Sequence, residues 1–248
     1  YNIAFFSTHT PFEIQNVLIP IICKRLRIPY VCWMHGGYGA NYVTCGYEAT
    51  DYALGQNYFV YGKEVKNLID EYYTRYKLKT YVAGSPGMIE RYKNYKYKEN
   101  KKKIITFVMG PWHNNSQYMA VDDQYYRFSY WEPIKTIIKL LINYKDKYHV
   151  ILRTSGSESQ NNSVINILKK YGAENSFEIS DSNSEPFKNV VMRTDVFINT
   201  WCSTTFWEEC LTDADIFLFD SGDLTEKAKK NISSRSFCYY NLETFIEN

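Results

Sequence analysis

Residues 196–209 read VFINTWCSTTFWEE, and this stretch determines how the rest of the chain is interpreted. The segment 196–199 predicts a short buried strand, and the segment 205–211 predicts a helix. Three consecutive hydroxyl side chains, Ser203, Thr204 and Thr205, lie between the strand and the body of the helix. A strand that passes through a short polar turn into a helix is the repeating unit of α/β folds.

The same strand–turn–helix unit recurs on both sides of this stretch. Strands are predicted at 3–8, 30–35, 57–61, 80–83, 104–109, 149–153, 177–179, 196–199 and 216–219. Helices are predicted at 14–27, 63–74, 132–144, 164–171, 185–191 and 205–211. This alternation predicts an α/β fold with parallel sheets and helices on both faces. A polar, lysine-rich stretch at 93–103 interrupts the pattern, so we expect two domains, 1–95 and 96–248.

Composition excludes several other classes of protein. Hydrophobic residues make up 45% of the chain and charged residues 23%, which is typical of a folded globular protein. The net charge is +2 and no basic stripe extends beyond Lys101–Lys103, so no nucleic acid is expected as a partner. No apolar run approaches the roughly 20 residues of a membrane helix. Because the chain starts at Tyr1 next to an apolar run, we expect a fragment of a longer protein.

Cysteine and acidic residues give no sign of a metal site. The six cysteines include no C-x-x-C pair, so a reducing, cytoplasmic setting without structural metal is expected. Asp213 and Asp215 are spaced like the D-x-D motif of metal-dependent transferases. That motif should follow a strand, whereas this pair precedes the strand predicted at 216–219, so we reject it.

Polar or glycine-rich segments follow four of the predicted strands. Ligands of parallel sheets bind beyond the carboxyl ends of the strands, so these segments are the candidates for a functional site. If both halves of the chain are Rossmann-like and face each other, all four segments line one cleft. The segments are 35–39, 110–114, 153–157 and 200–205.

The first segment supplies the candidate for catalysis. His35 titrates near neutrality, which suits a base that deprotonates an acceptor hydroxyl. Gly36 and Gly37 allow a ligand to approach the backbone closely, and Tyr38 and Ser85 are further candidate substrate contacts. A histidine that only hydrogen-bonds at a strand end, with glycines that only serve the turn, stays open as the alternative.

The hydroxyl segment is the strongest candidate for holding a phosphate. Ser203, Thr204 and Thr205 open a helix, where hydroxyls and free backbone N–H groups favour an anion. Thr205 and Glu208 also satisfy the spacing of a capping box, which stabilises a helix start without any ligand. Capping does not explain three successive hydroxyls, so we favour the phosphate role. We include Glu208 among the residues expected to contact the ligand that carries this phosphate.

The two remaining segments are weaker candidates for the same ligand. Arg153, followed by Thr154 and Ser155, offers a fixed cation for a phosphate or a carboxylate, although a solvated surface loop is the alternative. Gly110 fits a glycine that admits a nucleotide against the first strand of the second half. Trp112 and His113 could stack on or hydrogen-bond a base or sugar, or could equally be packed loop residues.

Four motifs occur in the chain: Ile28-Pro29-Tyr30-Val31 with His35-Gly36-Gly37, Val82–Gly87 with its Gly-Ser-Pro, Ile151-Leu152-Arg153, and Ser203-Thr204-Thr205-x-x-Glu208. In this order they resemble motifs of the GT-B glycosyltransferase superfamily. They most resemble bacterial enzymes of capsule, O-antigen and teichoic-acid assembly that use cytidine-activated donors. The resemblance covers about residues 1–220. Two features depart from the pattern: no His-Pro follows Arg153, and the last motif continues Glu-Glu-Cys rather than Glu-Ala.

The resemblance implies two Rossmann-like lobes, of which the N-terminal one is only partly present. It implies that His35 acts as base or acceptor-site residue, that Ser203 and Thr204 hold the leaving phosphate, and that Arg153 neutralises its charge. No metal and no cofactor besides the nucleotide-sugar donor are implied. The implied partners are that donor and a glycan or lipid-linked glycan acceptor. A cytoplasmic location is implied, and peripheral contact with the inner face of the membrane stays open.

Three other functions remain open at this point. A transferase that moves a polyol phosphate from a CDP-linked donor would share the fold. A non-catalytic module that binds a nucleotide or glycan would need no base at His35. A sugar-nucleotide epimerase with the same two lobes would act without an acceptor.

Overall fold

The protein is described by a computed structural model that covers residues 6–9, 14–34, 52–53, 55–93, 95–96, 100–110, 123–156, 158–220 and 224–247. The chain forms two compact units, each with a parallel sheet of its own. Unit 1 contains residues 1–89 and 222–231, and unit 2 contains residues 90–221 and 232–248. The predicted domains, 1–95 and 96–248, stay a prediction; in the structure the first crossing between units falls at 89/90, and residues 222–231 group with unit 1.

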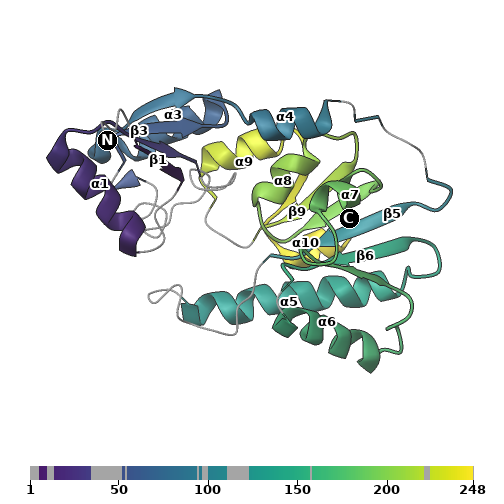
Figure 1. Cartoon of the computed structure of the whole chain (residues 1–248). Coiled ribbons are helices and arrows are strands. Elements are labelled where there is room, and N and C mark those ends of the chain that lie inside the picture. Colours follow the sequence, from purple (N-terminus) through teal and green to yellow (C-terminus); the bar gives the residue numbers. More distant parts are fainter. Residues whose placement is uncertain are drawn as a thin grey trace. The chain divides into compact units, whose positions relative to one another are not determined.

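Unit 1 is built on a four-stranded sheet whose order follows the chain (Figure 1). Its strands are β1 (Phe6–His9), β2 (Tyr30–Trp33), β3 (Asn57–Val60) and β4 (Lys79–Val82). Its helices are α1 (Ile14–Leu26), α3 (Lys63–Tyr72) and the short η2 (Thr74–Tyr76). Right-handed connections between successive parallel neighbours place α1 and α3 on the same face of the sheet.

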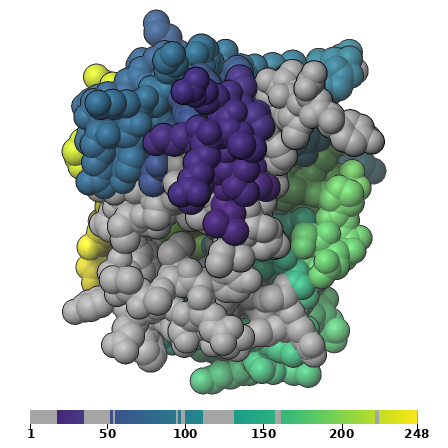
Figure 2. Space-filling view, turned by 60° about the vertical axis from the view of Figure 1, so that its left-hand side comes forward, coloured from purple at the N-terminus to yellow at the C-terminus, as the bar shows by residue number. Residues whose placement is uncertain are grey.

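Aromatic side chains fill the space between this face and its helices. Tyr58 of β3 packs edge-to-face on Tyr52, with ring centroids 5.6 Å apart, and Tyr52 packs on Tyr73 at 4.3 Å. Tyr30 and Cys23 are buried where α1 covers β2. The outer surface of α1 is purple in Figure 2 and lies beside the blue surface of later unit 1 residues.

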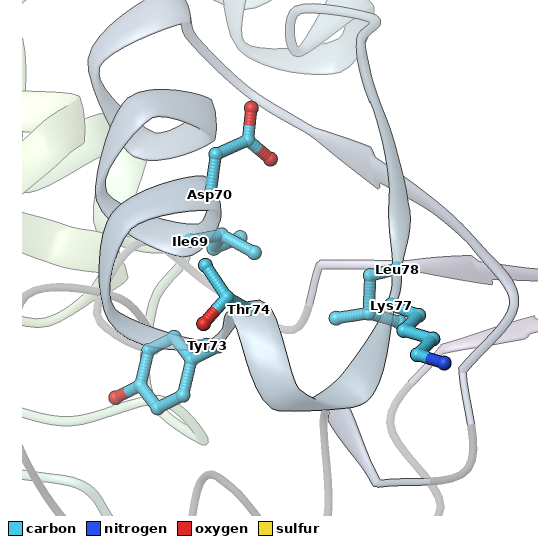
Figure 3. A pocket seen from close by; sticks show the side chains of 6 residues that line it. All are labelled: Ile69, Asp70, Tyr73, Thr74, Lys77 and Leu78. Carbon is cyan, nitrogen blue, oxygen red and sulfur yellow. The ribbon is translucent and has the colours of Figure 1, made fainter.

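A hollow of about 220 Å³ lies where α3 passes through η2 into β4 (Figure 3). Its lining residues are Ile69, Asp70, Tyr73, Thr74, Lys77 and Leu78. Burial raises the pKa of Asp70, but hydrogen bonds from Lys66 and Thr80 outweigh burial and lower it. The hollow is smaller than most ligand pockets and contains no residue that the sequence marked for function.

Unit 2 is built on a six-stranded sheet in the order β10-β9-β8-β5-β6-β7, with every neighbouring pair parallel. Numbered within the unit, this is 6-5-4-1-2-3, which is the strand order of Rossmann folds. The strands are β5 (Ile104–Val108), β6 (His149–Arg153), β7 (Glu178–Ser180), β8 (Val196–Asn199), β9 (Asp215–Phe219) and β10 (Phe237–Tyr239).

Helices cover both faces of this second sheet. Figure 1 shows α5 and α6 along one face and α8 on the other. Ile134, Ile137 and Ile138 of α5 are fully buried against Phe107 of β5 and Leu152 of β6, in the main hydrophobic core. The helices are α5 (Asp123–Ile142), α6 (Glu158–Lys170), α7 (Phe187–Val191), α8 (Thr204–Glu209) and α10 (Leu242–Glu247).

Two helices belong partly to each unit along the chain. The helix α4 (Pro86–Tyr92) leads from unit 1 into unit 2, and α9 (Glu226–Ile232) ends where the chain re-enters unit 2. Within unit 1, Lys227 of α9 donates a hydrogen bond to Glu71 of α3 at 2.9 Å. The predicted α/β fold with two parallel sheets is therefore confirmed.

Candidate functional site

The order of the unit 2 sheet reverses between β5 and β8, and two predicted segments meet there. The backbone N–H of Gly110, two residues beyond β5, donates to Oγ1 of Thr200, directly beyond β8, at 3.0 Å. A Cβ atom at Gly110 would lie 3.2 Å from Cβ of Trp201. Only glycine therefore fits this close approach without displacing its neighbour. Ligands of open α/β sheets bind at such reversals.

The hydroxyl cluster begins α8 beside this point. Ser203 is the N-cap residue with extended backbone angles, and its side chain makes no capping hydrogen bond. Instead Oγ of Ser203 lies 2.7 Å from Oγ1 of Thr205, so one hydroxyl donates to the other. The predicted capping box of Thr205 and Glu208 does not form, because the helix begins at Thr204 and Glu208 lies beyond the third helical position.

Glu208 is held by residues of α4 instead. Oη of Tyr92 donates to one carboxylate oxygen at 2.5 Å, and Nη1 of Arg91 lies 3.5 Å from the other. The Glu208 side chain is only 8% exposed, so these contacts stabilise a nearly buried carboxylate. Burial and this hydrogen bond raise the pKa of Tyr92 well above its ordinary value.

Arg153 ends β6 and is buried, with its guanidinium directed to the loop after β7. Nη1 donates to Oγ of Ser180 at 2.7 Å, to the Asp181 carbonyl at 2.7 Å and to the Glu185 carbonyl at 3.1 Å. The guanidinium also lies over the ring of Phe187, 5.6 Å from its centroid. Burial lowers the pKa of Arg153. Arg153 is therefore not a solvated residue of a surface loop. Its hydrogen bonds stabilise the loop after β7 at one edge of the candidate site.

The loops after β6 and β7 are joined to each other around Arg153. Oγ1 of Thr154 donates to Asn161 at 2.6 Å, and the backbone N–H of Thr154 donates to the Ser180 carbonyl at 3.0 Å. The carbonyl of Ser155 accepts a bond from Ser182 at 2.8 Å. Thr154 is buried and Ser155 is exposed, so Ser155 is the more accessible of these two predicted contacts.

A buried carboxyl group lies behind the reversal point. Glu209 of α8 is fully buried, and its Oε2 accepts from Nδ2 of Asn199, the last residue of β8, at 2.6 Å. Burial raises the pKa of Glu209 well above its ordinary value. Sequence reasoning missed this pair, and it included Thr200 only as the first residue of the segment 200–205. The available signal was Glu209 itself, an acidic residue on the inner face of a short helix, which needs a buried hydrogen-bond partner.

Several predicted residues lie outside the part of the chain that the structure describes. These are His35, Gly36, Gly37 and Tyr38 of the first segment, and Trp112 and His113 after Gly110. Their roles, and the shared cleft, stay predictions. Ser85 is described: it precedes α4, and its carbonyl accepts the backbone N–H of Ile89 at 3.0 Å.

The described residues form neither a metal-binding group nor a membrane-spanning helix. Among them, no group of three or more His, Cys, Asp or Glu side chains is placed to hold a metal ion. Within the same ranges, every helix is too short or too polar to cross a bilayer.

The arrangement in unit 2 suits an anionic ligand with hydroxyl groups. The three predicted strand ends of this unit, after β5, β6 and β8, share the carboxyl edge of one parallel sheet. Gly110 allows close approach, and the hydroxyls of Ser203–Thr205 can exchange their internal bond for bonds to phosphate oxygens. A carboxylate such as Glu208 can accept hydrogen bonds from ligand hydroxyls but repels phosphate.

No protein-family profile and no curated protein matches the chain. Solved structures do resemble it. A glycosyltransferase from Rickettsia africae ESF-5 has 15% identity and a TM-score of 0.53, covering 97% of this chain and 64% of that one. S. aureus MnaA with UDP has 11% identity and a TM-score of 0.62, covering 98% and 65%. The UDP-GlcNAc 2-epimerase of Methanocaldococcus jannaschii, with UDP-GlcNAc and UDP, has 11% identity and a TM-score of 0.59, covering 98% and 67%.

These likenesses show that the chain has a GT-B type fold. The chain spans less than two thirds of the length of the Rickettsia and S. aureus proteins. At identities of 11–15% the likeness concerns the fold alone.

Proposed function

We propose that the chain is part of a GT-B glycosyltransferase that moves a sugar from a nucleotide-activated donor to a bacterial surface glycan or its lipid-linked precursor. One observation supports this most: Gly110 and Thr200, the first residue of the segment 200–205, meet at the reversal of a Rossmann-type sheet. The backbone bond from Gly110 to Thr200 at 3.0 Å fixes that meeting point. Nucleotides are a frequent ligand at this position in such sheets.

In this proposal the donor lies at the carboxyl edge of the unit 2 sheet. The hydroxyls of Ser203, Thr204 and Thr205 hold the leaving phosphate, and no metal is needed. Preorganised donors of this kind lower the barrier by stabilising the charge that develops on the leaving nucleotide. His35 is the proposed base for the acceptor hydroxyl. Arg153 contributes mainly a fixed positive charge at one edge of the site, because the three hydrogen bonds of its Nη1 go to residues of its own chain.

The sequence resemblance favours a cytidine-activated donor, and the proposal keeps that preference. The solved structures that contain UDP make uridine the main competitor. The two bases differ in the hydrogen-bonding groups at one ring position, so direct binding measurements separate them.

Isothermal titration calorimetry with CMP, CDP, UDP and GDP tests the proposal. The wild-type chain should bind cytidine nucleotides more tightly than the others. A Ser203→Ala/Thr204→Ala double variant should bind at least about tenfold more weakly, because two donors to the phosphate are lost. Ser176→Ala, in the connection between α6 and β7, is the matched control and should not change affinity. If no nucleotide binds the wild-type chain, the proposal is wrong.

An epimerase acting on a UDP-linked sugar is the second candidate. One observation favours it: the solved structures that resemble the chain include the M. jannaschii epimerase, with a TM-score of 0.59 for its complex with UDP-GlcNAc and UDP. The two activities differ in their need for an acceptor. Conversion of UDP-GlcNAc to its epimer without any acceptor, followed by NMR, would favour the epimerase.

A further inference from the structure

A buried pair of side chains closes the turn that leads from β8 into α8. Asn199 is the last residue of β8, and Glu209 is the last residue of α8, which begins at Thr204. Nδ2 of Asn199 donates to Oε2 of Glu209 at 2.6 Å, and both residues are fully buried. The bond therefore joins the strand before the turn to the helix after it.

The second oxygen atom of each side chain is buried as well. No described residue donates a hydrogen bond to Oε1 of Glu209 or to Oδ1 of Asn199. A buried acceptor without a donor destabilises a fold, so two such atoms on one hydrogen-bonded pair require an explanation. An ionised carboxylate offers none, because it has no proton to donate.

A single proton would satisfy both atoms. A protonated carboxyl group is a donor as well as an acceptor, and a primary amide presents a donor and an acceptor side by side. With the proton on Oε1, the O–H of Glu209 donates to Oδ1 of Asn199, while Nδ2 of Asn199 donates to Oε2. The two groups then form a cyclic acid–amide pair held by two hydrogen bonds.

The surroundings of Glu209 favour the protonated form. Burial is the main cause that raises its pKa well above 4.5, and the charge of Glu208 raises the pKa further. The hydrogen bond from Asn199 and the positive charge of Arg235 act in the opposite direction but do not outweigh burial. A fully buried carboxyl group is costly to ionise because it loses its hydration.

The other groups around Glu209 do little to stabilise a negative charge there. Nη2 of Arg235 donates to the carbonyls of Thr212 and Ala214, which holds this guanidinium on the backbone. The remaining titratable groups that interact with Glu209 are two thiols and a phenol, each with a pKa raised by burial and therefore uncharged near neutral pH: Cys202, Cys210 and Tyr92.

We propose that Glu209 holds this proton and is a positioning residue for the candidate nucleotide site. The acid–amide pair fixes the end of β8, where Thr200 follows Asn199 and accepts the backbone N–H of Gly110 at 3.0 Å. It also fixes α8, whose first turn belongs to the hydroxyl segment. Glu209 does not touch the ligand in this role. The positioning role rests on the proposed function, whereas the protonated pair does not.

Infrared spectroscopy on the whole chain detects the proton directly. The C=O stretch of a protonated carboxyl group is separated from the bands of a carboxylate and of an amide. Near neutral pH, the difference spectrum between the wild type and Glu209→Gln should contain this stretch. Glu178→Gln is the matched control and should lack it, because hydrogen bonds from Arg193 lower the pKa of Glu178 to about 2. If the Glu209→Gln difference spectrum also lacks the stretch, Glu209 is ionised and the proposal is wrong.

Urea unfolding at several pH values measures how strongly the folded chain retains the proton. Because folding raises the pKa of Glu209, the stability of the wild type is greatest below pH 4.5 and falls as pH rises towards the folded-state pKa. In Glu209→Gln, two amides can form two hydrogen bonds without a titrating proton. Relative to this variant, the unfolding equilibrium constant of the wild type should increase about tenfold per pH unit above pH 4.5. A constant ratio would contradict the protonated pair.

Nucleotide calorimetry near neutral pH tests the positioning role. Asn199→Asp places two carboxyl groups opposite each other, so one hydrogen bond is lost and affinity for CDP and UDP should fall about tenfold. Adding Glu209→Gln restores an acid opposite an amide, with the two roles exchanged, and should recover most of that affinity. Asn162→Asp, at an exposed position of α6, is the control for the substitution itself and should bind like the wild type. Circular dichroism checks that every variant is folded.

The outcomes separate this inference from the proposed function. If the wild type binds nucleotides and Asn199→Asp binds them equally well, the positioning role is wrong. The same conclusion follows if Asn199→Asp/Glu209→Gln binds no better than Asn199→Asp. If the infrared band is present but no nucleotide binds the wild type, the positioning role fails together with the proposed function, and the protonated pair is supported.

Discussion

Replacing Tyr92 by phenylalanine should weaken unit 2 by about 2 kcal/mol. The phenol donates to Glu208 at 2.5 Å, and the other contact of that carboxylate, Arg91 at 3.5 Å, is at the limit of a hydrogen bond. A hydrogen bond to a charged group contributes about 1.5–3 kcal/mol to stability. Phenylalanine keeps the ring packing, so the loss comes from the hydrogen bond and from the carboxylate left almost buried.

Urea unfolding, followed by fluorescence, measures this loss. Tyr171→Phe is the control, because Tyr171 is 42% exposed and its hydroxyl can bond to water; it should change stability by less than about 0.5 kcal/mol. The double variant Tyr92→Phe/Glu208→Met removes both partners and should be more stable than the sum of the single changes predicts.

The result that would refute this reasoning is a cost for Tyr92→Phe no larger than that for Tyr171→Phe. If the stability loss of the double variant equals the sum of the losses of the two single variants, Tyr92 and Glu208 do not act as a pair. Nucleotide calorimetry on Tyr92→Phe adds a functional measurement. Because α8 begins at the hydroxyl cluster, a loosened Glu208 should also weaken CDP and UDP binding by several-fold.

Three more outcomes follow from the geometry. Gly110→Ala should weaken CDP and UDP binding about tenfold in calorimetry and cost about 1–2 kcal/mol in urea unfolding, because the new Cβ would lie 3.2 Å from Trp201. Hydrogen bonds from Arg193 lower the pKa of Glu178 from 4.5 to about 2, so its stabilisation is complete above about pH 4.5 and is lost as pH falls towards 2. Glu178→Gln should therefore cost about 1–2 kcal/mol near pH 7 and almost nothing near pH 2, as measured by urea unfolding at both. Arg153→Met should cost about 2–4 kcal/mol in the same assay, because one buried and two half-buried acceptors lose their donor.

The strands of unit 2 were the most predictable part of the fold. Residues 149–153 and 196–199 are strands with the predicted bounds, because short apolar runs between polar segments leave little choice. The helix predicted at 132–144 instead starts at Asp123 and continues through Pro133. Proline next to Glu132 resembled the first turn of a helix, and sequence alone does not show that tertiary packing extends the helix upstream.

Other elements were not predicted because their signals are weak or misleading. Gly84-Ser85-Pro86-Gly87 indicates a turn, yet Pro86 begins α4, a position that proline tolerates well. The strand β10 has three residues and no periodicity, so it is recognised only through its pairing with β9. The return of 222–231 to unit 1 depends on contacts such as Lys227 with Glu71, which are remote in sequence.

The candidate site was predictable in its position but not in its internal contacts. The rule that ligands bind beyond strand ends led to Gly110 and the hydroxyl cluster, which the structure brings to one edge of unit 2. The partners of Glu208 were not predictable, because Tyr92 is 116 residues away in the sequence. The same holds for Arg153, whose bonds reach the loop after β7.

Because residues 222–231 belong to unit 1 and residues 232–248 to unit 2, no single chain break separates the two units. A truncation after Ser221 would leave unit 1 without its last helix and unit 2 without its edge strand β10. During synthesis on the ribosome, unit 1 therefore stays unfinished until most of unit 2 has emerged. Neither half can mature as an independent module, and limited proteolysis should release no stable fragment that corresponds to either unit alone.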